Sequence, residues 1–254
     1  MEKFDKFVDI IRTLRSENGC PWDREQTHES LRQNLIEESY EVVESIDNKD
    51  MANLREELGD VLLQIVFHSL IAEEEKDFTI EEVIDEISEK MVRRHPHVFG
   101  DVSAETSEEV LKNWDEIKKV EKKEKTLGES MVRIPKALPA NIRAEKAQKK
   151  AAKIGFDFAD YDEVLGKVYE ELKELEEAKA IGNVNDIEEE FGDLMFSMVN
   201  LSRFLQINAE NSLTNATNKF INRFVSIELL AERENKRLSD LTIDEMNELW
   251  ERVK

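Results

Sequence analysis

The acidic residues of this 254-residue chain include two groups with the same internal spacing. Each group has an E-E-x-x-E motif and, sixteen residues after its last glutamate, an E-x-x-D motif; Glu171 of the second group lies 133 residues after Glu38 of the first. The carboxylates are Glu37, Glu38, Glu41, Glu57 and Asp60 in the first copy, and Glu170, Glu171, Glu174, Glu190 and Asp193 in the second. A solvated acidic surface is not expected to keep its spacing in two copies, so the repeat predicts a duplicated carboxylate site.

The chemistry that fits these carboxylates is the binding of a hard divalent cation. Residues three or four apart share a helix face, so Glu171 should project beside Glu174. Carboxylates this close repel one another, and a bound cation removes that repulsion. Ligand sets made only of oxygen favour Mg²⁺, with Mn²⁺ as an alternative, over zinc. The predicted metal ligands are Glu171, Glu174, Glu190 and Asp193 in the second copy and Glu38, Glu41, Glu57 and Asp60 in the first.

A glycine lies between the two acids of each E-x-x-D motif, Gly59 in the first copy and Gly192 in the second. Glycine inside a helix costs about 1 kcal/mol relative to alanine. We therefore expect a neighbouring helix or a ligand to approach the backbone closely at both positions.

Other interpretations account for less of this pattern. A single E-E-x-x-E motif is weak, because most such motifs are solvated surface. A di-iron carboxylate bundle requires two E-x-x-H elements, and the one candidate in this chain is Glu25 to His28. The two histidines of His95-Pro96-His97 stand at a helix end, where packing and capping are more typical than metal binding.

Basic residues accompany the carboxylates, as a ligand that carries phosphates would require. A cation held by carboxylates keeps waters and takes further ligands from substrate phosphates. Lys167 precedes Glu171 by one helical turn. The other basic and aromatic candidates occur in both halves at equal spacing. Lys219 and Arg223 correspond to Lys90 and Arg94, and Trp250 with Lys254 corresponds to Trp114 with Lys118. We predict phosphate contacts from Lys219 and Arg223. Trp250 either stacks on a base or anchors a core.

The segments that carry these residues have the apolar period of helices. Helices are predicted over 4–14, through the first acidic motif to residue 46, and over 51–75, 140–153, 162–181, 187–207 and 213–237. Capping residues predict three more helix starts, at Thr79 with Glu82, Thr106 with Glu109, and Thr242 with Glu245. No segment shows sustained two-residue alternation, so the chain should be all-α, with each acidic motif on an αα-hairpin.

The repeat and the composition divide the chain into two domains. We predict an N-terminal helical domain at 1–120, a linker at 121–136 that is charge-rich and then irregular, and a C-terminal helical domain at 137–254. Each domain should be a small helical bundle. The apolar faces left over on the motif helices predict dimerisation.

Charge and composition bear on the partners and the compartment of the protein. The formal net charge is -22, which disfavours binding to nucleic acids and anionic membranes because polyanions would be repelled. No stretch approaches the ~20 apolar residues of a membrane span. The single cysteine, Cys20, excludes an intramolecular disulfide framework and suits a reducing compartment, so we expect a cytoplasmic protein.

The duplicated acidic motifs resemble those of the MazG nucleoside triphosphate pyrophosphohydrolases. Further motifs strengthen the resemblance, which covers nearly the whole chain: N-K-F-x-x-R-F at 218–224, G-C-P-W-D at 19–23 and R-H-P-H-V-F-G-D at 94–101. It implies the all-α pyrophosphohydrolase fold, a homodimer, and Mg²⁺-dependent hydrolysis of ribo- and deoxyribonucleoside triphosphates of broad base range to monophosphate and pyrophosphate.

The resemblance also implies that the C-terminal domain is the catalytic one. Its metal ligands and nucleotide contacts would be Glu171, Glu174, Glu190 and Asp193, with Lys167, Lys219, Arg223 and Trp250. Two rivals stay open: a relative of the same superfamily that cleaves dUTP or phosphoribosyl-ATP, and a non-catalytic, nucleotide-binding regulatory module.

Overall fold

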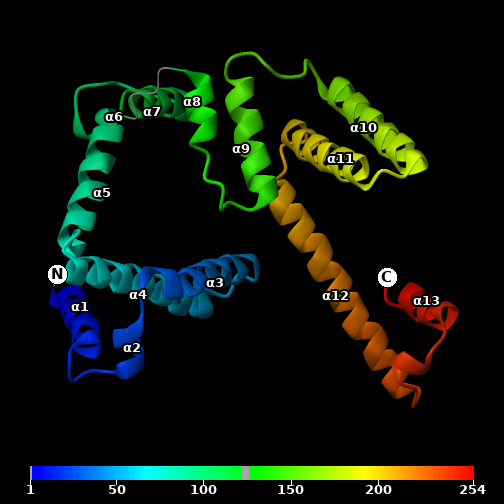
Figure 1. The fold of residues 1–254 in the computed structure, drawn as a ribbon, viewed down its shortest axis with the longest axis horizontal. Helices are drawn as coiled ribbons and strands as arrows, with labels where there is room; N and C mark the ends of the chain where they lie inside the picture. Colours follow the sequence, from blue (N-terminus) through cyan, green and yellow to red (C-terminus); the bar gives the residue numbers. More distant parts are fainter. Residues whose placement is uncertain (1, 122–125) are drawn as a thin grey trace. The chain divides into compact units, whose positions relative to one another are not determined.

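The computed structural model describes residues 2–121 and 126–254, and all regular structure within them is helical (Figure 1). These residues form thirteen α-helices and one short 3₁₀ segment, Leu238–Asp240, and they contain no strand. The predicted all-α class is therefore confirmed.

The chain divides into two compact units, Met1–Lys122 and Lys123–Lys254. The division falls inside the predicted linker 121–136, of which residues 122–125 lie outside the described part of the chain. A short helix, α8 (Leu127–Val132), occupies part of the segment that the sequence predicts as irregular. Thr126 caps it by accepting a hydrogen bond from the backbone N–H of Glu129. Six residues are too few for a helical period to show in the sequence.

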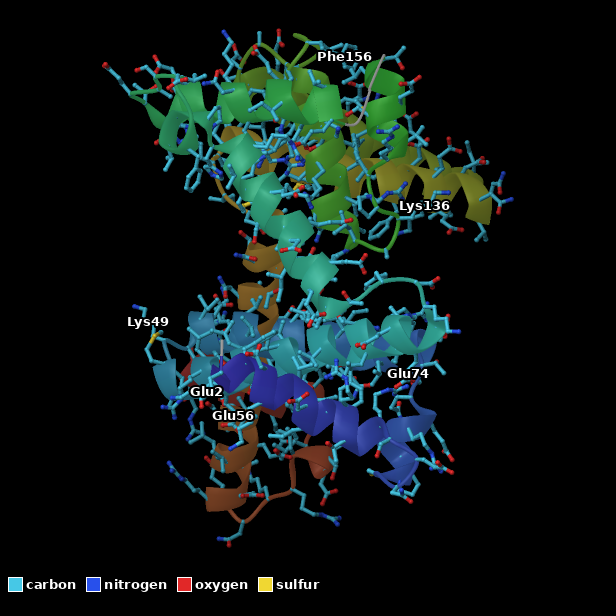
Figure 2. The ribbon with its side chains drawn as sticks, turned by 90° about the vertical axis from the view of Figure 1, so that its left-hand side faces the viewer. Glu2, Lys49, Glu56, Glu74, Lys136 and Phe156 are labelled. Carbon is cyan, nitrogen blue, oxygen red and sulfur yellow. The ribbon has the colours of Figure 1, made fainter. Side chains whose placement is uncertain are left out.

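The first unit is built around the hairpin of α3 (His28–Asp47) and α4 (Met51–Glu75). The other helices are α1 (Glu2–Arg15), α2 (Pro21–Glu25), α5 (Ile80–Arg94), α6 (Pro96–Phe99) and α7 (Ser107–Glu121). Buried apolar side chains from α1, α3, α4 and α5 form its core: Val8, Ile11, Leu31, Val66, Phe67, Leu70, Ile71 and Ile80. The buried Arg15 ties α1 to α4 through two hydrogen bonds to Glu74, of 2.7 and 2.9 Å (Glu74 is labelled in Figure 2).

The predicted capping residues explain where the helices of both units begin. Thr79 forms a capping box with Glu82 at α5, and Thr242 forms one with Glu245 at α13. Thr106 accepts from the backbone N–H of Glu109 at α7. Each of these contacts satisfies N–H groups that have no partner within the helix.

The second unit repeats the hairpin with α10 (Tyr161–Ile181) and α11 (Val184–Phe204). Its remaining helices are α8, α9 (Ala140–Ala152), α12 (Ala209–Arg233) and α13 (Ile243–Arg252). α12 starts at the open end of the hairpin and runs away from it, and α13 folds back beside the far part of α12 (Figure 1). A small core of Ile227, Ala231 and Leu249 holds α13 on α12.

Large apolar side chains of the second unit remain exposed on the faces of α11 and α12. They include Phe191, Met195, Phe196 and Met198 on α11, and Phe220, Ile221, Phe224 and Val225 on α12, each at least 40% exposed. Single apolar residues are common on protein surfaces, whereas several on one helix are typical of a surface that binds a partner. Within the described residues, no helix has the length and apolar character needed to cross a membrane.

Candidate metal and nucleotide site

The α10–α11 hairpin positions the carboxylates of the second copy. Gly182 ends α10 in the left-handed conformation, with φ of +84°, which glycine adopts without strain. Asn183 then caps α11 by accepting a hydrogen bond from the backbone N–H of Asn185. This tight turn returns the chain so that the E-E-x-x-E motif of α10 lies beside the E-x-x-D motif of α11.

Three of the predicted ligands converge on one point. Glu171, Glu174 and Glu190 each offer a carboxylate oxygen, and these oxygens lie within 4.8 Å of one another. Glu171 is buried, with 5% of its surface exposed. Asp193 lies outside this tight group, but its charge acts on Glu190. The predicted grouping of residues on two helices is therefore present, with Asp193 at its edge.

The electrostatics of the cluster favour a cation. Burial raises the pKa of Glu190 above its ordinary value, and repulsion from Glu174 and the other nearby carboxylates acts in the same direction. Oxygen-only ligands of this kind match the preference of Mg²⁺. The residues present therefore fit a hard divalent ion.

Lys167 already supplies one positive charge at this site. Its Nζ lies 2.5 Å from Oε1 of Glu171 and 3.1 Å from Oε1 of Glu170. The hydrogen bonds to Glu171 and Glu170 raise the pKa of Lys167, so it stays protonated at neutral pH. Lys167 therefore lies beside the carboxylates, on the helix face where the sequence places it; its contact with a nucleotide stays a prediction.

Lys219 and Arg223 do not join the carboxylates within one chain. Both lie on α12, which leaves the hairpin at its open end (Figure 1). Asp193 precedes the end of α11 by about 16 Å of helix, and Lys219 follows the start of α12 by about 15 Å. Neither basic side chain has an acidic partner among the residues that the structure describes.

Trp250 packs as part of the small α12–α13 core. Its ring lies 5.3 Å from that of Phe220, and the guanidinium of Arg223 lies over it at 5.8 Å. It is partly buried against the cluster that contains Leu249. This placement accounts for Trp250 as a core anchor, one of its two predicted roles; stacking on a base stays a prediction.

Nothing packs closely on Gly192 or Gly59. Apart from the chain neighbours and the backbone of its own helix, a Cβ atom built at either position would meet no atom within 4 Å among the described residues. The two helices of each hairpin therefore do not require these glycines for their own contact. The open space beside Gly192 adjoins Asp193 and leaves room for a ligand or another chain.

The first copy forms a similar cluster on α3 and α4. Carboxylate oxygens of Glu38, Glu41 and Glu57 lie within 4.8 Å of one another. Burial raises the pKa of both Glu38 and Glu57, with repulsion from neighbouring carboxylates, Asp60 included, adding to it. The position that corresponds to Lys167 is Asn34, so this copy has no lysine among its carboxylates.

The basic residues of the first unit also differ from those of the second. Arg94, the counterpart of Arg223, donates to Glu121 at 2.5 and 3.0 Å, and Arg93 donates to the same carboxylate at 2.7 Å. These contacts, led by Arg94, lower the pKa of Glu121 to about 2. The charge of Arg94 is therefore committed to an ion pair, whereas that of Arg223 is not.

The histidines serve packing in this structure. His95 caps α5 through Nδ1 and the backbone oxygen of Met91, 2.6 Å apart, and lies edge-on to Trp114. His28 and His68 are stacked, with their Nδ1 atoms 2.8 Å apart, which joins α3 to α4. The sequence does not predict this pair, because its members are forty residues apart and belong to no motif.

A cavity of about 450 Å³ in the second unit was also missed by sequence reasoning. It lies between α9, α11 and the loop that follows Gly155, and its polar lining residues include Gln148, Asn200 and Arg203. They come from separate elements and form no linear pattern. The signal that could have predicted them is the presence of polar residues at positions of α9 and α11 that face the protein interior.

Comparison with known proteins gives consistent matches along the chain. The MazG nucleotide pyrophosphohydrolase domain matches it twice, at residues 26–99 and 160–225. A Thermotoga maritima protein named nucleoside triphosphate pyrophosphohydrolase/pyrophosphatase MazG is 48% identical, over 99% of this chain and 95% of that protein. The nucleoside triphosphate pyrophosphohydrolase of Escherichia coli K12 is 42% identical, over 100% of this chain and 98% of that protein. A Bacillus subtilis protein named uncharacterized protein YabN is 49% identical over 99% of this chain and 52% of its own length.

Proposed function

This chain belongs to the MazG nucleotide pyrophosphohydrolase family, and we propose that it hydrolyses nucleoside triphosphates to nucleoside monophosphate and pyrophosphate. The substrates are ribo- and deoxyribonucleotides with a broad range of bases. The observation that carries the proposal is the convergence of Glu171, Glu174 and Glu190 within 4.8 Å on the hairpin of the second matched domain.

The resident metal in this proposal is Mg²⁺, with Mn²⁺ as the alternative. Glu171, Glu174 and Glu190 would hold it together with Asp193. When bound, the ion neutralises charge on phosphate oxygens and lowers the pKa of a coordinated water. The oxygen-only ligand set and the repulsion that raises the pKa of Glu190 support this choice.

In this proposal, Lys167 binds the triphosphate. Lys167 forms an ion pair with Glu171. With a divalent ion on Glu171, the charge of that carboxylate would be shared, and Lys167 would be held less tightly by it. The ammonium group could then turn toward the triphosphate, at most one helical turn from the metal ligands. There it stabilises charge that gathers on the leaving pyrophosphate.

The remaining cations come from a second copy of the chain in this proposal. Lys219 and Arg223 have no acidic partner among the described residues, and α12 runs away from the hairpin of its own chain (Figure 1). The same helix exposes Phe220 and Phe224 beside them. A homodimer that buries these apolar faces would bring α12 of one protomer to the open side of the hairpin of its partner. Arg223 would then bind phosphate through its planar, permanently charged guanidinium.

The C-terminal unit is the catalytic one in this proposal. Arg94 of the first unit is committed to Glu121, and Asn34 stands where Lys167 would be. The first copy thus keeps carboxylates for a cation but has lost two of the charges that a triphosphate requires.

The experiment that tests the function is release of pyrophosphate by the full-length protein. We expect release from each of the eight common ribo- and deoxyribonucleoside triphosphates in the presence of Mg²⁺, and loss of release when EDTA is added. Release from dUTP alone, or from none of the triphosphates, would contradict the proposal. The second result would favour a non-catalytic nucleotide-binding module.

A further inference from the structure

Two histidines join the helices of the first hairpin, and they take no part in the proposed reaction. His28 is the first residue of α3, and His68 lies in the second half of α4. Their Nδ1 atoms are 2.8 Å apart, whereas their ring centroids are 5.1 Å apart and the ring planes differ by 7°. Because the nitrogens are so much closer than the centroids, the parallel rings meet through their Nδ1 edges, at hydrogen-bond distance.

A hydrogen bond between two imidazole nitrogens requires one proton and no more. One Nδ1 carries the proton and donates it, and the other keeps its lone pair and accepts. With a proton on both Nδ1 atoms, two N–H groups would face each other and the bond would be lost. The contact between α3 and α4 at this point therefore depends on protonation, and histidine changes its charge near neutral pH.

The surroundings of His68 oppose a positive charge on its ring. A protonated imidazole donates from both nitrogens. Nε2 of His68 is buried and has no hydrogen-bond partner among the described residues, so a proton there would lack an acceptor. Burial lowers the pKa of His68 below its ordinary value, and the charge of His28 acts in the same direction.

The other charged groups at this end of the hairpin do not compensate a charge on His68. They include Glu29 and Arg32 of α3, Arg15 of α1, Asp23 of α2, Glu74 of α4 and Glu82 of α5. Arg15 is paired with Glu74, and Glu82 accepts from the backbone N–H of Thr79. The charges of His28 and Arg32 act on Glu29. Within the described residues, His28 is the charged group that acts on His68.

The second unit closes the same hairpin without histidines. At the 133-residue offset of the acidic motifs, His28 corresponds to Tyr161, the first residue of α10, and His68 corresponds to Leu201, a buried residue of α11. Leucine does not ionise, and tyrosine stays uncharged below its ordinary pKa of about 10. The fold therefore does not require histidines at these places, and they give the first unit a dependence on protons that the second lacks.

We propose that His28 and His68 form a pH-sensitive switch, which holds α3 on α4 through one shared proton and releases it when both rings are protonated. The open hairpin binds these protons more readily than the closed one. By linkage, the stability of the closed hairpin is greatest above about pH 6.5, the ordinary pKa of histidine, and decreases as pH falls from there toward the lower pKa of His68. Acid should loosen the helices of the first carboxylate cluster and leave those of the second unchanged.

Hydrogen–deuterium exchange of the full-length protein tests the switch. Protection of α3 and α4 is measured at about pH 7.5 and about pH 5, on either side of the ordinary pKa of histidine, without divalent cations and after correction for the intrinsic exchange rate. The matched variant is His28→Tyr with His68→Leu, which gives the first unit the residues of the second. We expect protection in the wild type to fall on the order of tenfold at the lower pH, as for the loss of a charge-sensitive hydrogen bond. In the variant, and in α10 and α11 of both proteins, it should change little.

The variant also separates the histidines from other groups that gain protons. The pKa values of Glu38 and Glu57 are raised by burial and by repulsion from neighbouring carboxylates. Their protonation relieves that repulsion and opposes the expected loss, and it occurs in both proteins. A fall of equal size in the variant, or an unchanged protection of α3 and α4 in the wild type, would overturn the proposal.

A measurement on the wild type alone covers the case in which the double variant does not fold. The chain has four histidines, so their ring nitrogens can be followed individually by NMR after labelling with ¹⁵N-histidine. We expect one proton shared by the Nδ1 atoms of His28 and His68 at neutral pH, and two coupled protonation steps as pH falls. Independent, single-step protonation of the two rings would refute the shared proton and with it the switch.

Discussion

Arg94 and Arg223 occupy corresponding helices of the two units, yet their surroundings differ. Arg94 and its carboxylate partner Glu121 are largely buried, with side chains 13% and 17% exposed. Arg223 lies over the ring of Trp250 and has no acidic partner among the described residues. A buried, doubly hydrogen-bonded pair holds its geometry, so Arg94 serves the stability of the first unit, whereas Arg223 is available to a ligand.

The Arg94–Glu121 pair should make stability depend on pH. The pKa of Glu121 is lowered to about 2 from an ordinary 4.5. A carboxylate with a lowered pKa in the folded state stabilises above its unfolded pKa, and this contribution is lost as pH falls through the folded value. We expect Arg94→Gln to lower Tm at pH 7, and the difference from the wild type to shrink between about pH 4.5 and pH 2.

Thermal unfolding followed by circular dichroism measures this difference. Arg12→Gln is the matched control, because Arg12 makes an exposed pair with Asp9 and Glu73, and exposed pairs contribute little. A difference for Arg94→Gln that stays constant across this pH range would assign its effect to packing instead of charge.

The sequence predicts some residues of the site well and others not at all. Glu171, Glu174 and Glu190 could be predicted because their spacing is repeated and helical geometry converts spacing into proximity. The cavity lined by Gln148 and Asn200 could not be predicted, because it forms only when α9 packs on α11. The indole ring of Trp250 is suited to stacking on a base, so the sequence leaves two roles open. Its packing against Phe220 and the cluster of Leu249 depends on tertiary structure and could not be predicted.

Among the elements, the hairpins follow from local signals and the path of α12 does not. The turns at Asn48–Asp50 and at Gly182–Asn183 fix both hairpins, and capping residues fix the starts of α5 and α13. The direction of α12 depends on non-local contacts that no motif encodes. The sequence does not predict α8, because six residues form fewer than two helical turns and show no apolar period.

The proposed contribution of α12 in trans can be tested by complementation. Glu190→Gln removes a carboxylate of the hairpin, and Arg223→Ala removes a cation of α12. If the two come from different protomers, a dimer of one variant with the other has one site with both residues intact. We expect each variant alone to be inactive, and an equimolar mixture refolded together to recover about a quarter of wild-type activity.

The control for this experiment is a pair of substitutions in one element. Glu190→Gln mixed with Asp193→Asn should recover no activity, because both residues lie on α11. Absence of recovery for Glu190→Gln with Arg223→Ala, in a mixture shown to contain the mixed dimer, would place the two residues in one protomer.

At the scale of the whole molecule, one duplicated unit has diverged into two kinds of site. Both copies keep a carboxylate cluster within 4.8 Å. In the first unit Asn34 stands where the second has Lys167, Arg94 is bound to Glu121, and the core residue Phe67 stands at the position of Asn200. The sequence predicts the duplication but not the divergence, because the acids are identical in the two copies and the differences lie in their surroundings.

We propose that the carboxylates of the second unit, and not those of the first, carry catalysis. Glu190 and Glu57 hold corresponding places in the two clusters, so Glu190→Gln and Glu57→Gln form a matched pair. The measurement is the rate of Mg²⁺-dependent pyrophosphate release by each full-length variant, with helicity checked by circular dichroism. We expect Glu190→Gln to lower the rate on the order of a hundredfold or more, and Glu57→Gln to stay within about twofold of the wild type. A wild-type rate for Glu190→Gln, or an equal loss in both variants, would contradict the account.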